Sequence, residues 1–302
     1  MASPEAEALQ EQLRMLREAV LDQDATLEQQ RAQFEMATPM MCAAPEGVTW
    51  TEVDAGGVPA IWADPEDGST DHVVMYVHGG GYVIGSAGGY RHFTGHLANA
   101  VGCRVLSVDY RLAPEHPHPA AVEDSTAAYR WLLDQGFDPA RIAVSGDSAG
   151  GGLTMSTLVK LRDDGVALPV AGVPISPWVD MEGLGESMQT NADTDLLVDE
   201  AGLKQMADHF LAGQDARDPL AAPLYADLSG LPPLLIQAGG DETLLDDSTR
   251  LAAAAEGVGV DVQLDVFPEM QHVFHLFAGN MPEANEGFAQ IGAWLRPRLG
   301  LA

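Results

Sequence analysis

The stretch RIAVSGDSAGG, residues 141–151, runs through apolar residues and then breaks into glycines around one serine. It contains Gly146-Asp147-Ser148-Ala149-Gly150, a G-x-S-x-G sequence placed where a predicted strand passes into a predicted helix. A sharp turn of this kind strains the backbone at the serine and excludes side chains beside it, so glycine is required there. The helix that follows presents free backbone N–H groups to developing negative charge. This pattern alone does not distinguish between Ser148 as a turn residue and Ser148 as a nucleophile.

The segments on both sides of this stretch alternate between apolar strands and helices. We expect strands over 73–77, 104–108, 141–145, 170–176, 233–239 and 260–267, and helices over 121–135, 148–162, 245–256 and 284–298. This alternation predicts an α/β fold with a mostly parallel sheet covered by helices on both faces. Ligands of such sheets bind at the carboxyl ends of the strands.

Two segments stand outside the alternation. Residues 3–36 are rich in Glu, Gln, Leu and Ala and predict an amphipathic helix or helix pair, which Pro39 and Pro45 end. Residues 178–220 mix loop and short helix and resemble an insertion over the sheet. We therefore separate an N-terminal helical part, residues 1–45, from a main domain, residues 46–302. The N-terminal part could pack over the site or form the contact of a homodimer.

The composition argues against polyanionic partners. The 302 residues, 46% of them hydrophobic, suit one large folded domain. Forty-five acidic against 15 basic residues give a formal net charge of −30, which repels nucleic acid and anionic membranes. The acidic surface is either an adaptation to high salt, where screening relieves self-repulsion, or an ordinary solvated surface.

Targeting and redox signals are sparse. No run approaches the roughly 18 apolar residues of a membrane span, and the N-terminus begins acidic and helical, so we expect a cytoplasmic protein. Cys42 and Cys103 lack the C-x-x-C spacing, which indicates packing residues instead of a disulfide framework or a zinc site. We expect no metal and no organic cofactor.

A glycine-rich loop precedes the serine by one strand and one crossover. His78-Gly79-Gly80-Gly81 follows the predicted strand 73–77. Three glycines expose backbone N–H groups, which a hydrolase needs where a carbonyl oxygen becomes an oxyanion. His78 is expected to anchor this loop, since proton transfer requires only one histidine.

A nucleophilic serine needs a base, and the base needs an acid that orients it. Asp241 follows the predicted strand 233–239, and His272 follows the strand 260–267, so both lie at the same sheet edge as Ser148. We prefer them as acid and base because the alternatives lie on a turn, on the next helix or between apolar residues. Those alternatives are Glu242, Asp246 and Asp247 for the acid and His275 for the base.

Six blocks together resemble the hormone-sensitive-lipase-like esterases, bacterial family IV of the α/β-hydrolase superfamily. In chain order they are HGGGYVIG, DYRLAPEHPHPAAVED, RIAVSGDSAGGGL, SPWVD, GGDETLLDDS and MQHVF. The resemblance covers about residues 45–300. It implies an α/β-hydrolase fold in which residues 1–45 and 178–220 form a helical cap. The last two blocks look like a branch that includes monoterpene lactone hydrolases.

The resemblance also implies roles for single residues. Ser148 would be the nucleophile, His272 the general base and acid, and Asp241 the orienting carboxylate. The oxyanion hole would be formed by the N–H groups of Gly80, Gly81 and Ala149. Supporting roles would fall to His78, Gly79, Asp147 and Glu115, with a surface turn as the alternative for Glu115. The pocket candidates are Trp178, Met181, Tyr82 and Val273.

These residues predict a serine carboxylesterase that hydrolyses small, short-acyl esters through an acyl-enzyme. A lactone hydrolase, of the monoterpene ε-lactone type, or an amide hydrolase would use the same residues. A ligand-binding protein of the same fold is the non-enzyme alternative. We disfavour it because the sequence keeps His272, which plant hormone receptors that resemble this family have lost.

Overall fold

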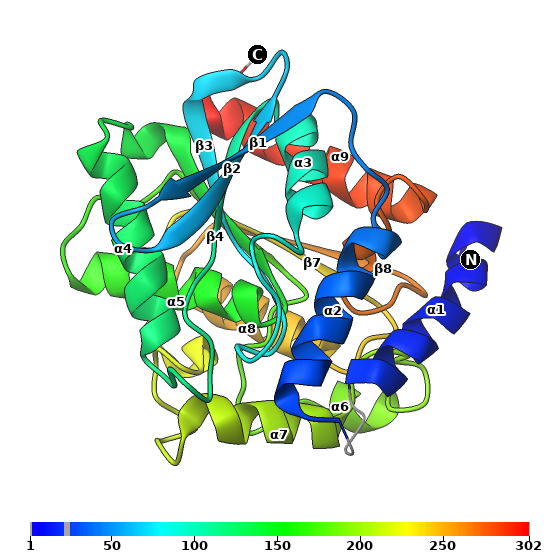
Figure 1. Ribbon diagram of the computed structural model, residues 1–302. Helices are drawn as coiled ribbons and strands as arrows, with labels where there is room; N and C mark the ends of the chain where they lie inside the picture. Colours follow the sequence, from blue (N-terminus) through cyan, green and yellow to red (C-terminus); the bar gives the residue numbers. More distant parts are fainter. Residues whose placement is uncertain (1, 21–24, 302) are drawn as a thin grey trace.

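The computed structural model describes residues 2–20 and 25–301 and shows a central eight-stranded sheet with helices on both faces (Figure 1). The strand order is β1-β2-β4-β3-β5-β6-β7-β8, with β2 antiparallel to its neighbours and the strands from β4 to β8 parallel. The strands are β1 Val48–Asp54, β2 Pro59–Pro65, β3 Ser69–Val77, β4 Cys103–Val108, β5 Ile142–Asp147, β6 Ala171–Ile175, β7 Leu234–Gly239 and β8 Val262–Phe267.

Helices cover the two faces of the sheet. The pair α3 (Arg91–Val101) and α9 (Pro282–Leu299) packs on one face. The helices α4 (Ala120–Asp134), α5 (Ala149–Asp163) and α8 (Leu245–Gly257) lie on the other (Figure 1). The central strands are apolar along their length because both of their faces are buried. Every residue of β5 and β7 is buried, whereas the edge strand β1 is mostly exposed.

The α/β fold and its predicted strands are confirmed, since each expected strand and helix has a counterpart within a few residues. The sequence reading missed β1, β2 and α3, which precede or interrupt the βα alternation. It was also wrong about Pro39. The second N-terminal helix continues through that proline and ends two residues later, at Met41, so Pro39, which lacks an N–H to donate to the preceding turn, lies in its last turn and not beyond its end.

The N-terminal helices and the later insertion lie beside one another at one edge of the molecule (Figure 1). They comprise α1 (Pro4–Val20), α2 (Leu27–Met41), α6 (Ser187–Thr190) and α7 (Glu200–Leu211). Arg17 on α1 pairs with Asp199 at the start of α7, with 2.6 Å between nitrogen and oxygen. Residues 1 and 21–24 of the expected N-terminal part lie outside the described residues.

Strand register brings the loops of interest to one sheet edge. Val77 of β3 pairs with Gly146 of β5, and Asp147 pairs with Ile175 of β6. The residues that follow these strand ends therefore meet above the same edge. In the described part of the chain, no helix combines the length and the apolar character that crossing a membrane requires.

Candidate active site

Ser148 occupies the tight turn between β5 and α5. Its backbone has φ 53° and ψ −121°, a conformation that non-glycine residues rarely adopt. The N–H of Ser148 donates to the carbonyl of Ile175 at 2.8 Å, which fixes the turn on β6. A Cβ atom on Gly146 or Gly150 would collide with the carbonyl of Val77. Both glycines of the G-x-S-x-G sequence are thus required by the close approach of β3.

The glycine-rich loop after β3 lies next to this turn. Gly80 and Gly81 have φ values of 102° and 61°. A side chain on Gly80 would collide with the Ile84 carbonyl, and one on Gly81 with the Met206 sulfur. Among residues 2–20 and 25–301, no acceptor pairs with the N–H groups of Gly80, Gly81 or Ala149. These donors are available to a bound ligand.

Asp147 joins the glycine loop to the serine turn. Its buried carboxylate accepts hydrogen bonds from the Tyr76 hydroxyl at 2.5 Å, the Gly79 N–H at 2.9 Å and the Tyr90 hydroxyl at 2.9 Å. Burial raises the pKa of Asp147, and the two tyrosine hydrogen bonds oppose that rise. A side chain on Gly79 would overlap this carboxylate. Asp147 therefore sets the distance between the two loops that carry the free N–H groups.

His78 lies beneath the glycine loop and is fully buried. Its ring stacks on Tyr110, with 4.3 Å between ring centroids, and its Nδ1 lies 2.8 Å from the Gly79 carbonyl. The Tyr110 hydroxyl donates to the His78 carbonyl at 2.8 Å. These contacts brace the loop from below.

His272 is the histidine at the sheet edge, and its partner is Glu242. His272 Nδ1 lies 2.8 Å from Glu242 Oε2, and both side chains are buried. Burial opposes protonation of His272, yet the Glu242 carboxylate raises the pKa of the imidazole above its ordinary value. Burial also raises the pKa of Glu242. Nδ1 therefore carries the proton in the neutral ring, which leaves Nε2 as the proton acceptor.

The expectation that Asp241 orients the histidine is wrong. Asp241 is half-buried, and its backbone is held by the carbonyl of Met270 and the hydroxyl of Thr194. The two acids lie in the turn between β7 and α8, and the side chain that contacts His272 there is that of Glu242.

The other titratable alternatives have separate partners. Asp246 accepts from the N–H of Ser187, and Asp247 accepts from the N–H groups of Val179 and Asp180. His275 Nε2 lies 2.8 Å from the side-chain oxygen of Gln237, and burial lowers the pKa of this histidine to about 3. None of the three contacts His272.

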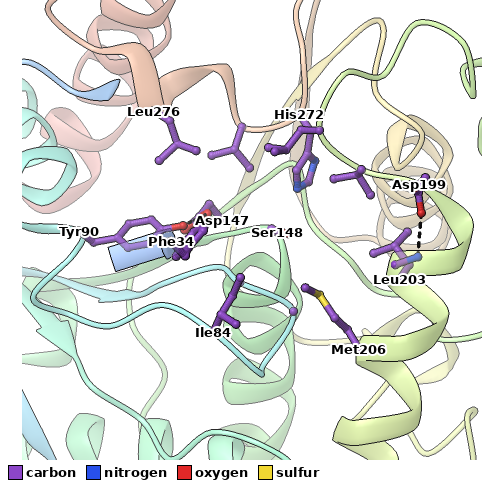
Figure 2. Close-up of a pocket in the computed structure, with 16 residues that line it drawn as sticks. Phe34, Ile84, Tyr90, Asp147, Ser148, Asp199, Leu203, Met206, His272 and Leu276 are labelled. Atoms are coloured by element: carbon purple, nitrogen blue, oxygen red, sulfur yellow. Dashed lines mark hydrogen bonds between the residues drawn. The ribbon is translucent and has the colours of Figure 1, made fainter. Parts of the chain in front are cut away.

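A pocket of about 80 Å³ opens onto Ser148, and the His272 ring points into it (Figure 2). Its walls are mainly apolar and come from α2, from the 197–206 segment and from the chain after β8. The residues that line it besides the serine and histidine include Phe34, Ile84, Leu197, Val198, Leu203, Met206, Val273 and Leu276. Within the described residues, no three His, Cys, Asp or Glu side chains are grouped so as to hold a metal ion.

Only one of the four pocket candidates lines this cavity. Val273 does so, with a left-handed φ of 48°. Trp178, Met181 and Tyr82 do not, and all three side chains are buried in the hydrophobic core. Trp178 donates its ring N–H to the Asp180 carbonyl, and Tyr82 is stacked on a phenylalanine of α7. The sequence did not identify Phe34 and Leu203 as pocket residues. Their only indication in the sequence was their place on amphipathic segments.

Glu115 pairs with Arg31 and not with Ser148 or His272. It is exposed and forms a two-pronged ion pair with Arg31 of α2 at 2.7 and 2.8 Å, which lowers the pKa of Glu115 to about 2. Arg31 also donates to the carbonyls of Val83 and Ala113, each at 2.8 Å. Glu115 thus supports the site indirectly, by fastening α2 over the segment that follows the glycine loop.

The chain is similar to known proteins over most of its length. The family model described as alpha/beta hydrolase fold matches residues 74–276. An acetyl-hydrolase of Streptomyces hygroscopicus is 46% identical over 250 residues, which cover 82% of this chain and 83% of the relative. The carboxylesterase NlhH of Mycobacterium tuberculosis is 39% identical over 242 residues, covering 75% of this chain and 74% of that protein.

Solved structures extend the similarity to almost the whole chain. The crystal structure of an esterase from the bacterial hormone-sensitive lipase family superposes with a TM-score of 0.95 at 47% identity. The match covers 99% of this chain and 100% of that one. With its serine turn, glycine loop and buried His272–Glu242 pair, the chain belongs to the hormone-sensitive-lipase-like esterases of the α/β-hydrolase family and is a carboxylic ester hydrolase.

Proposed function

We propose that the protein is a serine carboxylesterase that acts on small, short-acyl esters through Ser148, His272 and Glu242. The observation that carries this proposal is the buried Nδ1 to Oε2 contact of 2.8 Å between His272 and Glu242, on a histidine that shares a pocket with Ser148. An acid that holds Nδ1 directs Nε2 toward the substrate and stabilises the imidazolium.

In the first half of the reaction, Ser148 Oγ attacks the ester carbonyl while His272 Nε2 takes the hydroxyl proton. The carbonyl π electrons move onto oxygen, and the resulting oxyanion accepts hydrogen bonds from Gly80, Gly81 and Ala149. Each such donor contributes about 3 kcal/mol of transition-state stabilisation. Collapse of the intermediate breaks the C–O bond, and the leaving alcohol takes the proton from His272.

In the second half, water replaces the alcohol. His272 removes a proton from the water, which attacks the acyl-serine carbonyl and forms a second oxyanion. Its collapse releases the carboxylic acid and returns the proton to Ser148 Oγ. Neither half-reaction changes an oxidation state, so acid–base groups and hydrogen-bond donors are sufficient for it.

The pocket supports a small, uncharged acyl or alcohol group. Its free volume is about 80 Å³ and its walls are mainly apolar, and no lysine or arginine is among the described residues that line it. An anionic substrate would meet no positive partner there and would be repelled by the net charge of −30. The acetyl-hydrolase similarity favours acetyl esters in particular.

The cap assignment belongs to the same proposal. Residues 1–45 and 178–220 would form a helical cap, because Phe34 of α2 and Leu203 of α7 both line the pocket. The ion pairs Arg17–Asp199 and Arg31–Glu115 tie the N-terminal helices to the rest of the molecule. If α1 and α2 also formed a homodimer contact, Phe34 would have to keep its place in the pocket wall.

The test is hydrolysis of p-nitrophenyl esters from acetate to laurate, with a cyclic lactone and an anilide, by wild type and Ser148→Ala. Cleavage of short esters that disappears in the variant supports the proposal. A preference for the lactone or the anilide would mean that the same residues act mainly on that substrate class instead of on simple esters. A wild type that binds esters without cleaving them would indicate a ligand-binding protein, and an equally active variant would contradict the nucleophile.

A further inference from the structure

Residues 187–198, the part of the insertion that precedes α7, form hydrogen bonds with the loop that carries the acid and with the loop that carries the base. Asn191 Nδ2 donates to the carbonyls of Gly240 at 3.1 Å and of Glu242 at 2.9 Å. Thr194 Oγ1 donates to the Asp241 carbonyl at 3.1 Å. The acid loop between β7 and α8 is therefore held by side chains from the insertion.

The same segment also reaches the histidine loop through Gln271, the residue before His272. The Leu196 N–H donates to the Gln271 side-chain oxygen at 2.7 Å, and Gln271 Nε2 donates to the Thr194 carbonyl at 3.0 Å. The two loops come from different strands, and the insertion bridges them. Hydrogen bonds from one segment therefore link the loop that carries Glu242 to the loop that carries His272.

Asp195 lies at the centre of the bridge and is 1% exposed. One carboxylate oxygen accepts from the N–H groups of Leu197 and Val198, at 2.9 and 2.8 Å. The other accepts from the N–H and the hydroxyl of Thr243, at 2.7 and 3.0 Å. The hydrogen bonds from Leu197 and Val198 form an ordinary local turn. The hydrogen bonds from Thr243 join residues that are 48 positions apart in the sequence, and Thr243 is adjacent to Glu242. Leu197 and Val198 also line the pocket, so one carboxylate touches both the pocket wall and the acid loop.

The charge of Asp195 also reaches the base. Three carboxylates raise the pKa of the His272 imidazole: Glu242, which contacts the ring, and, through space, Asp195 in the insertion and Asp147 at the end of β5. Each favours the protonated ring, against the opposing effect of burial, and Glu242 contributes most among them. Asp195 differs from Glu242 in that its oxygens are hydrogen-bonded to Thr243 and its own segment instead of to the imidazole.

We propose that Asp195 is a positioning residue of the esterase, which holds the Glu242–Thr243 turn against His272 and ties that turn to the pocket wall. The inference rests on the proposed function, because it acts through the Glu242–His272 pair. A misplacement of about 1 Å at a reacting group can cost about 10²-fold in rate, so the loss of this bridge should be visible in turnover.

The test is Asp195→Asn, which preserves the size of the side chain and one acceptor oxygen for the local turn. The amide nitrogen that replaces the other oxygen faces two donors on Thr243 and cannot accept from them. We expect kcat/KM at the alkaline plateau to fall by about tenfold to hundredfold. We also expect the acidic limb of the pH profile to move to lower pH, because removing a negative charge near His272 makes its protonated form less stable.

The matched control is Asp193→Asn, which removes the same charge from an exposed position two residues away. It should change neither kcat/KM at the alkaline plateau nor the pH at which the acidic limb lies. A merely structural role for Asp195 would lower the yield of folded enzyme and leave kcat/KM per folded active site unchanged, so an unchanged alkaline plateau in Asp195→Asn overturns the proposal.

Thr243→Val decides the question if Asp195→Asn does not fold. It removes one donor to Asp195 while preserving the charge and the side-chain shape. A lower kcat with an unchanged KM supports the proposal, and unchanged kinetics overturn it. Ser148→Ala separates this result from the proposed function. If that variant is inactive and Asp195→Asn behaves like Asp193→Asn, only the role of Asp195 is lost.

Discussion

The carboxylate of Glu242 lies 2.8 Å from Nδ1 of His272, and the adjacent Asp241 does not share this contact. The pair is buried, so water competes little for its hydrogen bond, and an ion pair formed during turnover would be weakly screened. Loss of the Glu242 carboxylate should therefore reduce turnover far more than loss of the Asp241 carboxylate, and replacing each acid by its amide tests this difference.

Glu242→Gln should reduce kcat by about 10⁴-fold, because a glutamine cannot stabilise the imidazolium and can hold the wrong tautomer. Asp241→Asn removes a neighbouring charge without touching His272 and should remain close to wild type. Both variants are measured with p-nitrophenyl acetate after circular dichroism has shown equal folding. The opposite ranking of the two variants would restore Asp241 as the acid.

The pH dependence of kcat/KM should place the acidic limb above the ordinary histidine value of 6.5, because Glu242 raises the pKa of His272 despite its burial. The sign follows from the role of the ring. The base must be neutral, so activity is absent well below the pKa of the free enzyme and rises as pH passes through it. A limb centred below 6.5 would mean that burial outweighs the carboxylate. Initial rates at substrate concentrations far below KM, from pH 5 to 9, measure it.

Arg31→Met should detach α2 from the segment after the glycine loop. The guanidinium binds two backbone carbonyls besides Glu115, and a charged hydrogen bond contributes about 1.5–3 kcal/mol, more than an exposed ion pair alone. We expect a lower Tm and a higher KM, because Phe34 on the same helix lines the pocket. Arg91→Met, which removes a surface pair with Glu52, is the control and should leave both quantities nearly unchanged. Equal effects of the two substitutions would argue against a fastening role for Arg31.

Met206→Ala should widen the pocket beside the glycine loop. Met206 lines the cavity and lies against Gly81, so its truncation frees space where longer acyl chains can extend. Each additional buried methylene can contribute about 0.8 kcal/mol, which favours longer esters over acetate in the variant. The measurement is the ratio of kcat/KM for p-nitrophenyl octanoate to that for acetate. Met36→Ala, at an exposed position of α2, should leave the ratio unchanged, and a constant ratio in both variants would place the acyl chain elsewhere.

The local features of the site could be predicted from the sequence because each depends on a few adjacent residues. The turn at Ser148 requires Gly146 and Gly150 wherever a strand and a helix meet so closely. The alternation of apolar strands and helices requires a parallel sheet, which brings His272 to the same edge as the serine. Pro39 shows the limit of such reasoning, since its effect depended on how close it stood to the helix end.

The choice of acid and the shape of the pocket were decided by tertiary structure. Asp241 and Glu242 are adjacent, and both carry a carboxylate. The backbone path after β7, held by Thr194 and Asp195, turns Glu242 toward His272. The pocket walls come from segments as distant as Phe34 and Leu276. Sequence by itself determined the strand-to-helix turn at Ser148 and the strand order that brings His272 to the same sheet edge, because backbone strain and strand order are local or periodic properties. Which side chains meet there depended on long-range hydrogen bonds and packing, since side-chain directions beyond a strand end are set by whatever the loop contacts.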